Sequence, residues 1–368
     1  MSALAEELFG REQVEKARRY HRPAYVAWPA NAAVGLGVLA LLVGVDPEFA
    51  DLPWWLAAAV ITGLAVVLPW VARLPIGYVF GHCWELRWGF STQSSRAWLT
   101  DRLKSLAVSL VLTVPLLVGL VALGRWFPGW WAPVAACAGA LFVLFVSLLA
   151  PVVIEPIFSR VRPLDDETLA GELRELADRA GTPVRDVFVA DASRRTTKVN
   201  AYVSGVGRTR RVVLFDTLLG KSSPAETKLV VAHELGHRRA RHIVKGTLLG
   251  MASTAAFVLF LWLVVGTPEP AEIPLILLLA GALQLVALPL GAVLSRRWER
   301  VADRFALDLT GDAGVFEETF RTLALANLSD LDPPRALYYA LFSHPTVPER
   351  IAFARRWADQ RGNVLTGS

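Results

Sequence analysis

Two histidines four residues apart, with a glutamate directly after the first, are the residues of this chain best suited to chemistry. They stand in the segment His233-Glu234-Leu235-Gly236-His237, within a stretch that predicts one helix from about Ser223 to Val244. Residues four apart on a helix share a face, one turn apart. Both imidazoles could therefore bind one metal ion, while Glu234 projects beside them toward a metal-bound water. This spacing is typical of zinc proteases.

A catalytic zinc ion needs a third protein ligand and an open position for water. No third histidine follows at the metzincin spacing, so this ligand must come from another part of the chain. Glu299 is the best candidate, because two membrane crossings return it to the side that holds His233. Asp303, one turn further along, could orient a ligand histidine. The sequence thus predicts one Zn²⁺ per chain on His233, His237 and Glu299.

Plainer interpretations of these residues stay open. The histidine pair could lie on the surface at a helix end, because three arginines follow it closely. Glu299 could belong to a charge cluster beside the membrane, with ordinary helical salt bridges. His242 lies five positions after His237, well round the helix, and we expect it to be solvated rather than a ligand.

Long apolar windows indicate a chain that crosses a membrane. Apolar residues make up 54% of the 368 residues and charged residues 19%, and a helix needs about 20 apolar residues to span a bilayer. Seven of the thirteen tryptophans stand at or beside window ends, the level that amphipathic rings prefer. A soluble protein with very large buried helices is disfavoured. The windows lie at about 26–45, 54–72, 105–124, 130–154, 247–266 and 272–294.

The distribution of basic residues predicts the orientation. The loops 46–53 and 266–271 carry acidic residues and no basic one, whereas 73–104, 155–246 and the C-terminal tail are rich in arginine. By the positive-inside rule, both termini and the active site of this multi-pass cell-membrane protein face the cytosol. Cytosolic loops facing anionic lipid explain the net charge of +5, so no nucleic-acid partner is expected.

We predict a mainly α fold: a polytopic membrane helix bundle with a cytosolic α+β zincin-type catalytic region on a HExxH helix. Five parts follow from the windows. They are a cytosolic N-terminal helix (1–25), four transmembrane helices (26–154), a cytosolic catalytic insert with the zinc motif (155–246), two transmembrane helices (247–294) and a cytosolic helical region with the third zinc ligand (295–368).

Within the insert, the pattern of residues predicts a helix and three strands. Asp166 to Ala180 places leucines on one helical stripe and charges elsewhere. Strands are expected at Val187–Ala190, Asn200–Ser204 and Arg211–Phe215. The last two strands form a hairpin through Gly205-Val206-Gly207.

The sequence resembles the CAAX prenyl protease family of integral-membrane zinc metalloproteases, of the a-factor-processing type, whose relatives include the HtpX-like membrane proteases. The resemblance extends from about Gly89-Phe90 through the final helix, roughly three quarters of the chain. It rests on the HELGH segment and on Glu155-Pro156-Ile157-Phe158, Ser193-Arg194-Arg195, Asn200-Ala201-Tyr202, Arg211 to Leu219, Glu299 to Asp303, Ser343-His344-Pro345 and Glu349-Arg350-Ile351.

This resemblance implies Glu299 as the third ligand, Asn200 near the substrate backbone, and His344 and Arg350 in the site. It also implies a chamber enclosed by membrane helices. His344 could then stabilise a tetrahedral oxyanion, and the β-rich segment of Asn200 could pair with an extended peptide. Without the resemblance, His344 is a turn histidine and Asn200 a hairpin asparagine. The chain has four predicted crossings before the zinc motif where eukaryotic members have five, which leaves substrate choice open.

The predicted function is a membrane-embedded zinc metalloendopeptidase that cleaves peptide bonds at the cytosolic membrane face. Zinc would polarise the scissile carbonyl and activate water, while Glu234 takes the water proton and passes it to the departing amine. The expected partners are membrane lipid and a peptide or protein substrate, either prenylated at a CAAX-type end or simply apolar.

Three alternatives to this function remain. An HtpX-like quality-control protease would use the same site, so the sequence does not separate the two. An intramembrane-cleaving metalloprotease would place the histidine pair within an apolar helix, and the arginines after His237 argue against it. A catalytically inactive membrane scaffold is disfavoured by the intact ligands and Glu234.

Overall fold

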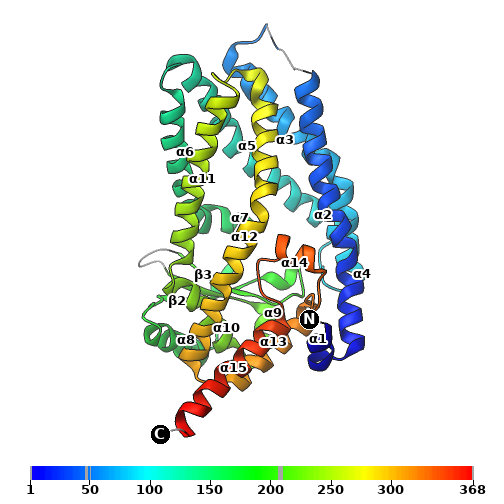
Figure 1. Cartoon of the computed structure of the whole chain (residues 1–368), viewed down its shortest axis with the longest axis vertical. Helices are drawn as coiled ribbons and strands as arrows, with labels where there is room; N and C mark the ends of the chain where they lie inside the picture. The colour runs from blue at the N-terminus through cyan, green and yellow to red at the C-terminus, as the bar shows by residue number, and fades with distance from the viewer. Residues whose placement is uncertain (1, 46–48, 50, 206–209, 367–368) are drawn as a thin grey trace.

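The computed structural model describes residues 2–45, 49, 51–205 and 210–366, and long helices dominate it (Figure 1). Six described helical segments are long and apolar enough to cross a membrane, which confirms all six predicted windows. In Figure 1 they run alongside one another, and the strands and shorter helices gather at one end of this bundle. The segments are Arg11–Val45, Trp54–Arg87, Ser95–Trp126, Trp131–Phe158, His242–Val264 and Pro270–Thr310.

The membrane bundle is built from α2 (Arg11–Val45), α3 (Trp54–Tyr78), α5 (Ser95–Trp126), α6 (Trp131–Leu149), α11 (His242–Val264) and α12 (Ile273–Thr310). Short π-helical segments extend α3 toward α4 (Trp84–Arg87) and α6 toward α7 (Glu155–Phe158). Large apolar side chains point outward along the bundle, with Leu263 exposed by 83% and Leu290 by 75%. Such side chains suit contact with lipid tails, which are as apolar as leucine.

Two helices run straight through predicted part boundaries. After α1 (Ser2–Phe9) and a turn at Gly10, whose φ is 77°, α2 continues without a break past residue 25. Likewise α12 passes residue 294 and ends only at Gly311, whose φ is 72°. The apolar part of a membrane helix ends at the edge of the lipid, whereas the helix itself continues for as long as its backbone hydrogen bonds do. The segment with Glu299 is therefore a rigid continuation of a membrane helix.

The catalytic insert contains a four-stranded sheet in the order β1-β2-β4-β3. Its strands are β1 (Val161–Pro163), β2 (Asp186–Ala190), β3 (Ala201–Ser204) and β4 (Arg211–Phe215). β2 pairs with β4 in parallel, and both β1 with β2 and β3 with β4 pair in antiparallel fashion. The predicted pairing of the last two strands is confirmed, while Val206 and Gly207 of the predicted turn lie outside the described residues. The short strand β1 was not predicted.

The helix α8 (Glu167–Arg179) covers this sheet. Asp166 caps it by accepting a hydrogen bond from the Leu169 amide at 3.0 Å, and Gly181, with φ of 65°, follows its end. Leu173 is fully buried against the sheet core. The predicted helix and its leucine stripe are confirmed.

The helix with the histidine pair is shorter than predicted. α10 spans Pro224–Arg239 and begins at a capping box between Ser223 and Glu226. The prediction of one helix through Val244 is wrong, because Arg241 adopts a left-handed conformation with φ of 57° and ψ of 37°. The chain turns there and starts the membrane helix α11 at His242.

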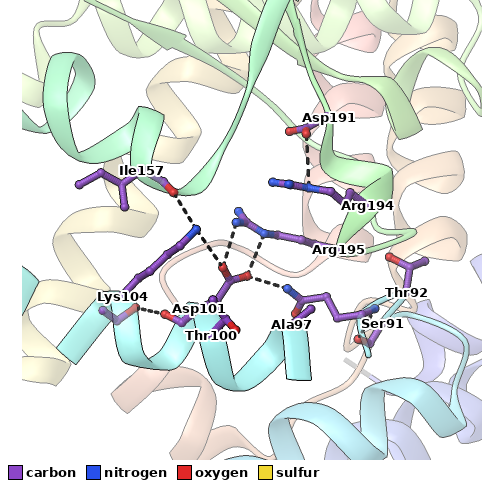
Figure 2. Close-up of polar contacts among 12 residues, drawn as sticks. Ser91, Thr92, Ala97, Thr100, Asp101, Lys104, Ile157, Asp191, Arg194 and Arg195 are labelled. Carbon is purple, nitrogen blue, oxygen red and sulfur yellow. Dashed lines mark hydrogen bonds and ion pairs between the residues drawn. The ribbon is translucent and has the colours of Figure 1, made fainter. Parts of the chain in front are cut away.

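The insert is tied to the membrane bundle just before β3 (Figure 2). Asp101 of α5 accepts a hydrogen bond from Arg195 at 3.2 Å and forms an ion pair with it, with Nε to Oδ2 at 3.0 Å. Lys104 donates to the Ile157 carbonyl oxygen at 3.3 Å. Ser91 and Thr196 form an isolated bridge. These contacts fix the segment that leads into Asn200, and they give Arg195 of the Ser193-Arg194-Arg195 segment a structural partner.

The C-terminal region folds back against α10 and α12. It contains α13 (Ala313–Asn327), α14 (Arg335–Leu341) and α15 (Val347–Thr366). Phe316, Ile351 and Ala354 are fully buried and pack with Leu307 of α12. This packing places His344, in the turn before α15, and Arg350, within it, next to the histidine pair.

Candidate metal centre and active site

The close approach of α10 and α12 creates the centre. A Cβ atom added at Gly236 would lie 3.0 Å from the Ala302 Cα atom and 3.1 Å from its carbonyl oxygen. Glycine between the two histidines therefore lets the helix backbones touch. This contact brings Glu299 of α12 beside the imidazoles of α10.

His233, His237 and Glu299 converge on one point. The Nε2 atoms of the two histidines lie 3.1 Å apart, and each of them lies 3.2 Å from a different carboxylate oxygen of Glu299. One ligand atom from each residue lies within 4.8 Å of the others. Apart from His233 Nε2 and the Arg350 guanidinium at 3.8 Å, no described residue offers a hydrogen-bond donor to the buried Oε2 atom of Glu299. Two nitrogens and one carboxylate form a donor set of catalytic zinc, so these residues fit a metal ion.

Behind His233 lies a buried charged network. Its Nδ1 atom is 3.0 Å from Asp303 Oδ1, and Asp303 also accepts from Arg350, with Nε to Oδ2 at 2.9 Å. Asp303 is 1% exposed, and the Arg350 guanidinium stacks on Phe320 at 3.8 Å from the ring centroid. Burial opposes the charged imidazole, yet the hydrogen bonds to Asp303 and Glu299 raise the pKa of His233 to about 9. These surroundings favour positive charge at this ring, whether from a proton or from a metal ion.

Behind His237 lies a second imidazole. His242 Nδ1 is 2.9 Å from His237 Nδ1, and the His242 ring stacks on Trp298 with centroids 4.8 Å apart and planes 6° apart. At 4% exposure, His242 is buried, so the prediction of a solvated histidine is wrong. The left-handed turn at Arg241 returns His242 to His237, which counting along one continuous helix could not reveal.

Glu234 projects into the space in front of the ligand cluster. It lines two cavities of about 530 and 570 Å³, which also share Asn200, His233 and His344. Burial raises the pKa of the Glu234 carboxyl, with the His233 and His237 rings opposing that effect. A carboxylate whose pKa moves toward neutrality is a better proton acceptor at physiological pH.

His344 and Asn200 both line these two cavities. His344 Nε2 lies 3.3 Å from Glu299 Oε1, and 60% of its side chain is accessible. Asn200 is exposed directly before the edge strand β3 and accepts a hydrogen bond from the Ala201 amide at 2.9 Å. The structure therefore brings all eight predicted site residues together. Arg350 binds Asp303, and the other residues form the ligand cluster or line the cavities. His242 is the residue that the sequence missed.

Two family models match this chain and together span most of it. Residues 163–358 match the model of peptidase family M48. Residues 5–160 match the model for the CAAX prenyl protease N-terminal region with five membrane helices. Within the described part of these N-terminal residues, four helices are long and apolar enough to cross a membrane.

Individual proteins show the same relationship. The uncharacterized metalloprotease YhfN of Bacillus subtilis is 31% identical over 327 residues, which cover 82% of this chain and 76% of that protein. CAAX prenyl protease 1 of Saccharomyces cerevisiae is 31% identical over 333 residues, which cover 78% and 70%. The crystal structure of S. mikatae Ste24p shares the fold, with a TM-score of 0.79 and 24% identity over 93% of this chain and 89% of that one.

Proposed function

The chain belongs to peptidase family M48 and is a membrane zinc metalloprotease, and we propose that His233, His237 and Glu299 hold its metal ion. The observation that carries this proposal is the convergence of three ligand atoms within 4.8 Å, beside cavities that Glu234 also lines. When bound there, zinc supplies a Lewis acid that polarises a carbonyl group and lowers the pKa of water to about 7.

Glu234 is the proposed proton carrier. Its carboxylate takes the proton of the attacking water and delivers it to the amine that leaves as the peptide bond breaks. The accessible imidazole of His344 donates a hydrogen bond to the oxyanion that forms at the scissile carbonyl. Asp303 and Arg350 act through His233, whose ring orientation they hold.

The edge strand β3 is the proposed docking site for the peptide backbone. β3 pairs on one side with β4, and Asn200, Ala201 and Val203 line the cavity that contains His233 and Glu234. An extended peptide adds to such an edge through main-chain hydrogen bonds, and Asn200 provides an amide for the same purpose.

We propose apolar and lipid-linked peptides as substrates. The 570 Å³ cavity is bordered by Val203 of β3, by Ile243 at the start of α11 and by Trp298 of α12. A lipid tail that enters it gains about 0.8 kcal/mol per buried CH₂. CAAX prenyl protease 1 of yeast is among the relatives, which supports a prenylated peptide as one substrate. We expect cleavage of farnesylated and unmodified apolar peptides alike, with the lipid improving binding less than about tenfold, or about 1.4 kcal/mol.

The active site is proposed to face the cytosol. The arginine-rich segments lie at the end of the bundle that holds the ligand cluster, and the positive-inside rule places that end in the cytosol. In a background without Cys83 and Cys137, Thr267→Cys should react with an impermeant reagent outside intact cells, and Gln360→Cys should not. The reverse labelling pattern would contradict this orientation.

The central experiment compares Glu234→Gln with the wild-type protein. This variant should keep its zinc, because no ligand is removed, and should lose peptide cleavage, because the proton acceptor is gone. Zinc content and cleavage of a matched peptide pair, with and without a farnesyl group, are measured in detergent. Substantial cleavage by Glu234→Gln would overturn the role of Glu234. A farnesyl preference of about a hundredfold or more would restrict the substrates to prenylated peptides.

A further inference from the structure

A third cavity, of about 390 Å³, lies at the C-terminal end of α10 and is lined by four arginines: Arg210, Arg238, Arg239 and Arg241. No aspartate or glutamate is among its described lining residues. Elsewhere in the described chain, arginines such as Arg195, Arg211 and Arg350 pair with carboxylates. This cavity therefore concentrates positive charge that the described residues leave without a counter-ion.

Among residues 2–45, 49, 51–205 and 210–366, none of these four arginines forms an ion pair. Arg238 donates a hydrogen bond to the Gly205 carbonyl oxygen. Four guanidinium groups around one cavity repel one another, and an anion bound among them would relieve that repulsion.

Two buried polar atoms at this cavity also lack partners. Thr182 is 6% exposed, and its hydroxyl oxygen has no hydrogen bond in the described structure. The Arg210 Nε atom is likewise buried without an acceptor. Buried polar groups are nearly always hydrogen-bonded. A ligand with several acceptor oxygens would satisfy both, since a hydroxyl and a guanidinium are donors that suit a phosphate.

The membrane helix α11 begins at the same cavity. Its first residues include Ile243 and Val244, which line the cavity and are 49% and 53% exposed. The first backbone N–H groups of a helix have no partner within it, and the helix dipole favours an anion there. α11 is 23 residues long, so its N-terminus lies at the level where a bilayer presents its headgroups.

We propose that this cavity is a binding site for a phosphate group, supplied by the headgroup of an anionic lipid beside α11. Free phosphate offers the same oxygens, so the experiment must separate the two sources. The arginine side chains and Thr182 bind the phosphate, while Ile243 and Val244 adjoin the acyl chains. His237 lines the same cavity, so the bound phosphate lies next to a proposed metal ligand.

The test uses the full-length protein with its metal. Lipid retention is measured by native mass spectrometry after reconstitution with phosphatidylglycerol or phosphatidylcholine, and thermal unfolding is followed with added inorganic phosphate in neutral detergent. The test variant is Arg239→Gln with Arg241→Gln. The matched control is Arg96→Gln with Arg102→Gln, which removes two exposed arginines on α5 that also lie beside the membrane and form no described ion pair. Both pairs lose the same general attraction to anionic lipid.

We expect the cavity pair to lose phosphatidylglycerol retention at least tenfold more than the control pair, with phosphatidylcholine retention unchanged. Thr182→Val, which removes one hydroxyl without changing charge, should weaken retention in the same direction and guards against misfolding of the double variant. Stabilisation by inorganic phosphate that requires Arg239 and Arg241, without a phosphatidylglycerol preference, keeps the site and assigns it to free phosphate. Equal losses in both pairs for lipid, together with no phosphate effect, would overturn the proposal.

Discussion

His233 and His237 present the same nitrogen atom to the same carboxylate, but different groups stand behind their rings. His233 rests on Asp303, which Arg350 holds in turn. His237 rests on His242, which Trp298 covers. His233 is thus supported by a pair of charged side chains, and His237 by an imidazole at the start of α11 that stacks on an indole ring.

The difference shows how one centre can join two parts of the fold. Arg350 comes from α15, so the His233 side depends on the packing of the C-terminal helices. His242 is the first residue of α11, so the His237 side depends on where the membrane helix begins. Glu299 serves both sides, because α12 is the helix that runs from the membrane into the catalytic region. Substitutions can therefore compare how much the shared ligand Glu299 and the partners of each histidine contribute to zinc affinity.

Glu299→Ala should cause the largest effect. It removes the ligand that both imidazoles share, and it leaves two nitrogens, too few for a catalytic zinc site. We expect zinc affinity to fall by more than about a hundredfold, beyond the range for loss of an outer partner. Competition with a coloured chelator measures the affinity, and Glu234→Gln is the control that should keep it. Unchanged affinity in Glu299→Ala would move the third ligand to another residue.

Asp303→Asn should come next. The hydrogen bond between His233 and Asp303 involves a carboxylate, and such charged bonds contribute about 1.5–3 kcal/mol. We expect zinc affinity to fall about 10–100-fold, as for other partners of ligand histidines. The matched control is Asp308→Asn, which makes the same change further along α12, where the carboxylate is 44% exposed. Equal losses in the two variants would mean that Asp303 does not support His233 specifically.

The fold was predictable wherever a local rule decides an element. Apolar length located all six described helices that are long and apolar enough to cross a membrane, and the cap at Asp166 with Gly181 after the end located α8. A helix after residue 294 that ends at Gly311 was predictable from the sequence, but its continuity with the membrane helix was not, because polarity marks the edge of the lipid and not the end of a helix. Nor was the break at Arg241, where a residue other than glycine adopts a left-handed conformation.

The candidate site divides in the same way. Spacing alone pointed to His233 and His237, and the return of the chain across the membrane pointed to Glu299. Asn200, His344 and Arg350 are isolated in the sequence, so only the family resemblance singled them out. His242 escaped because its contact with His237 depends on one backbone turn. A prediction that places each residue on an unbroken helix cannot find such a contact.

The smallest of these effects should come from His242, and two substitutions separate its two contacts. When His237 uses Nε2 as a ligand atom, its Nδ1 atom carries the proton and donates a hydrogen bond to His242 Nδ1. A neutral hydrogen bond contributes about 0.5–1.5 kcal/mol, so His242→Phe should lower zinc affinity by roughly two- to tenfold while it keeps the stack on Trp298. His242→Asn keeps an acceptor and loses the stack, so its zinc affinity should stay nearer the wild-type value, while the metal-free protein unfolds at a lower temperature. Chelator competition and thermal unfolding without metal measure the two quantities. If His242→Phe binds zinc as tightly as the wild-type protein, ring packing alone orients His237. The two histidines would then differ in that Asp303 hydrogen-bonds His233, whereas His237 is held by packing only.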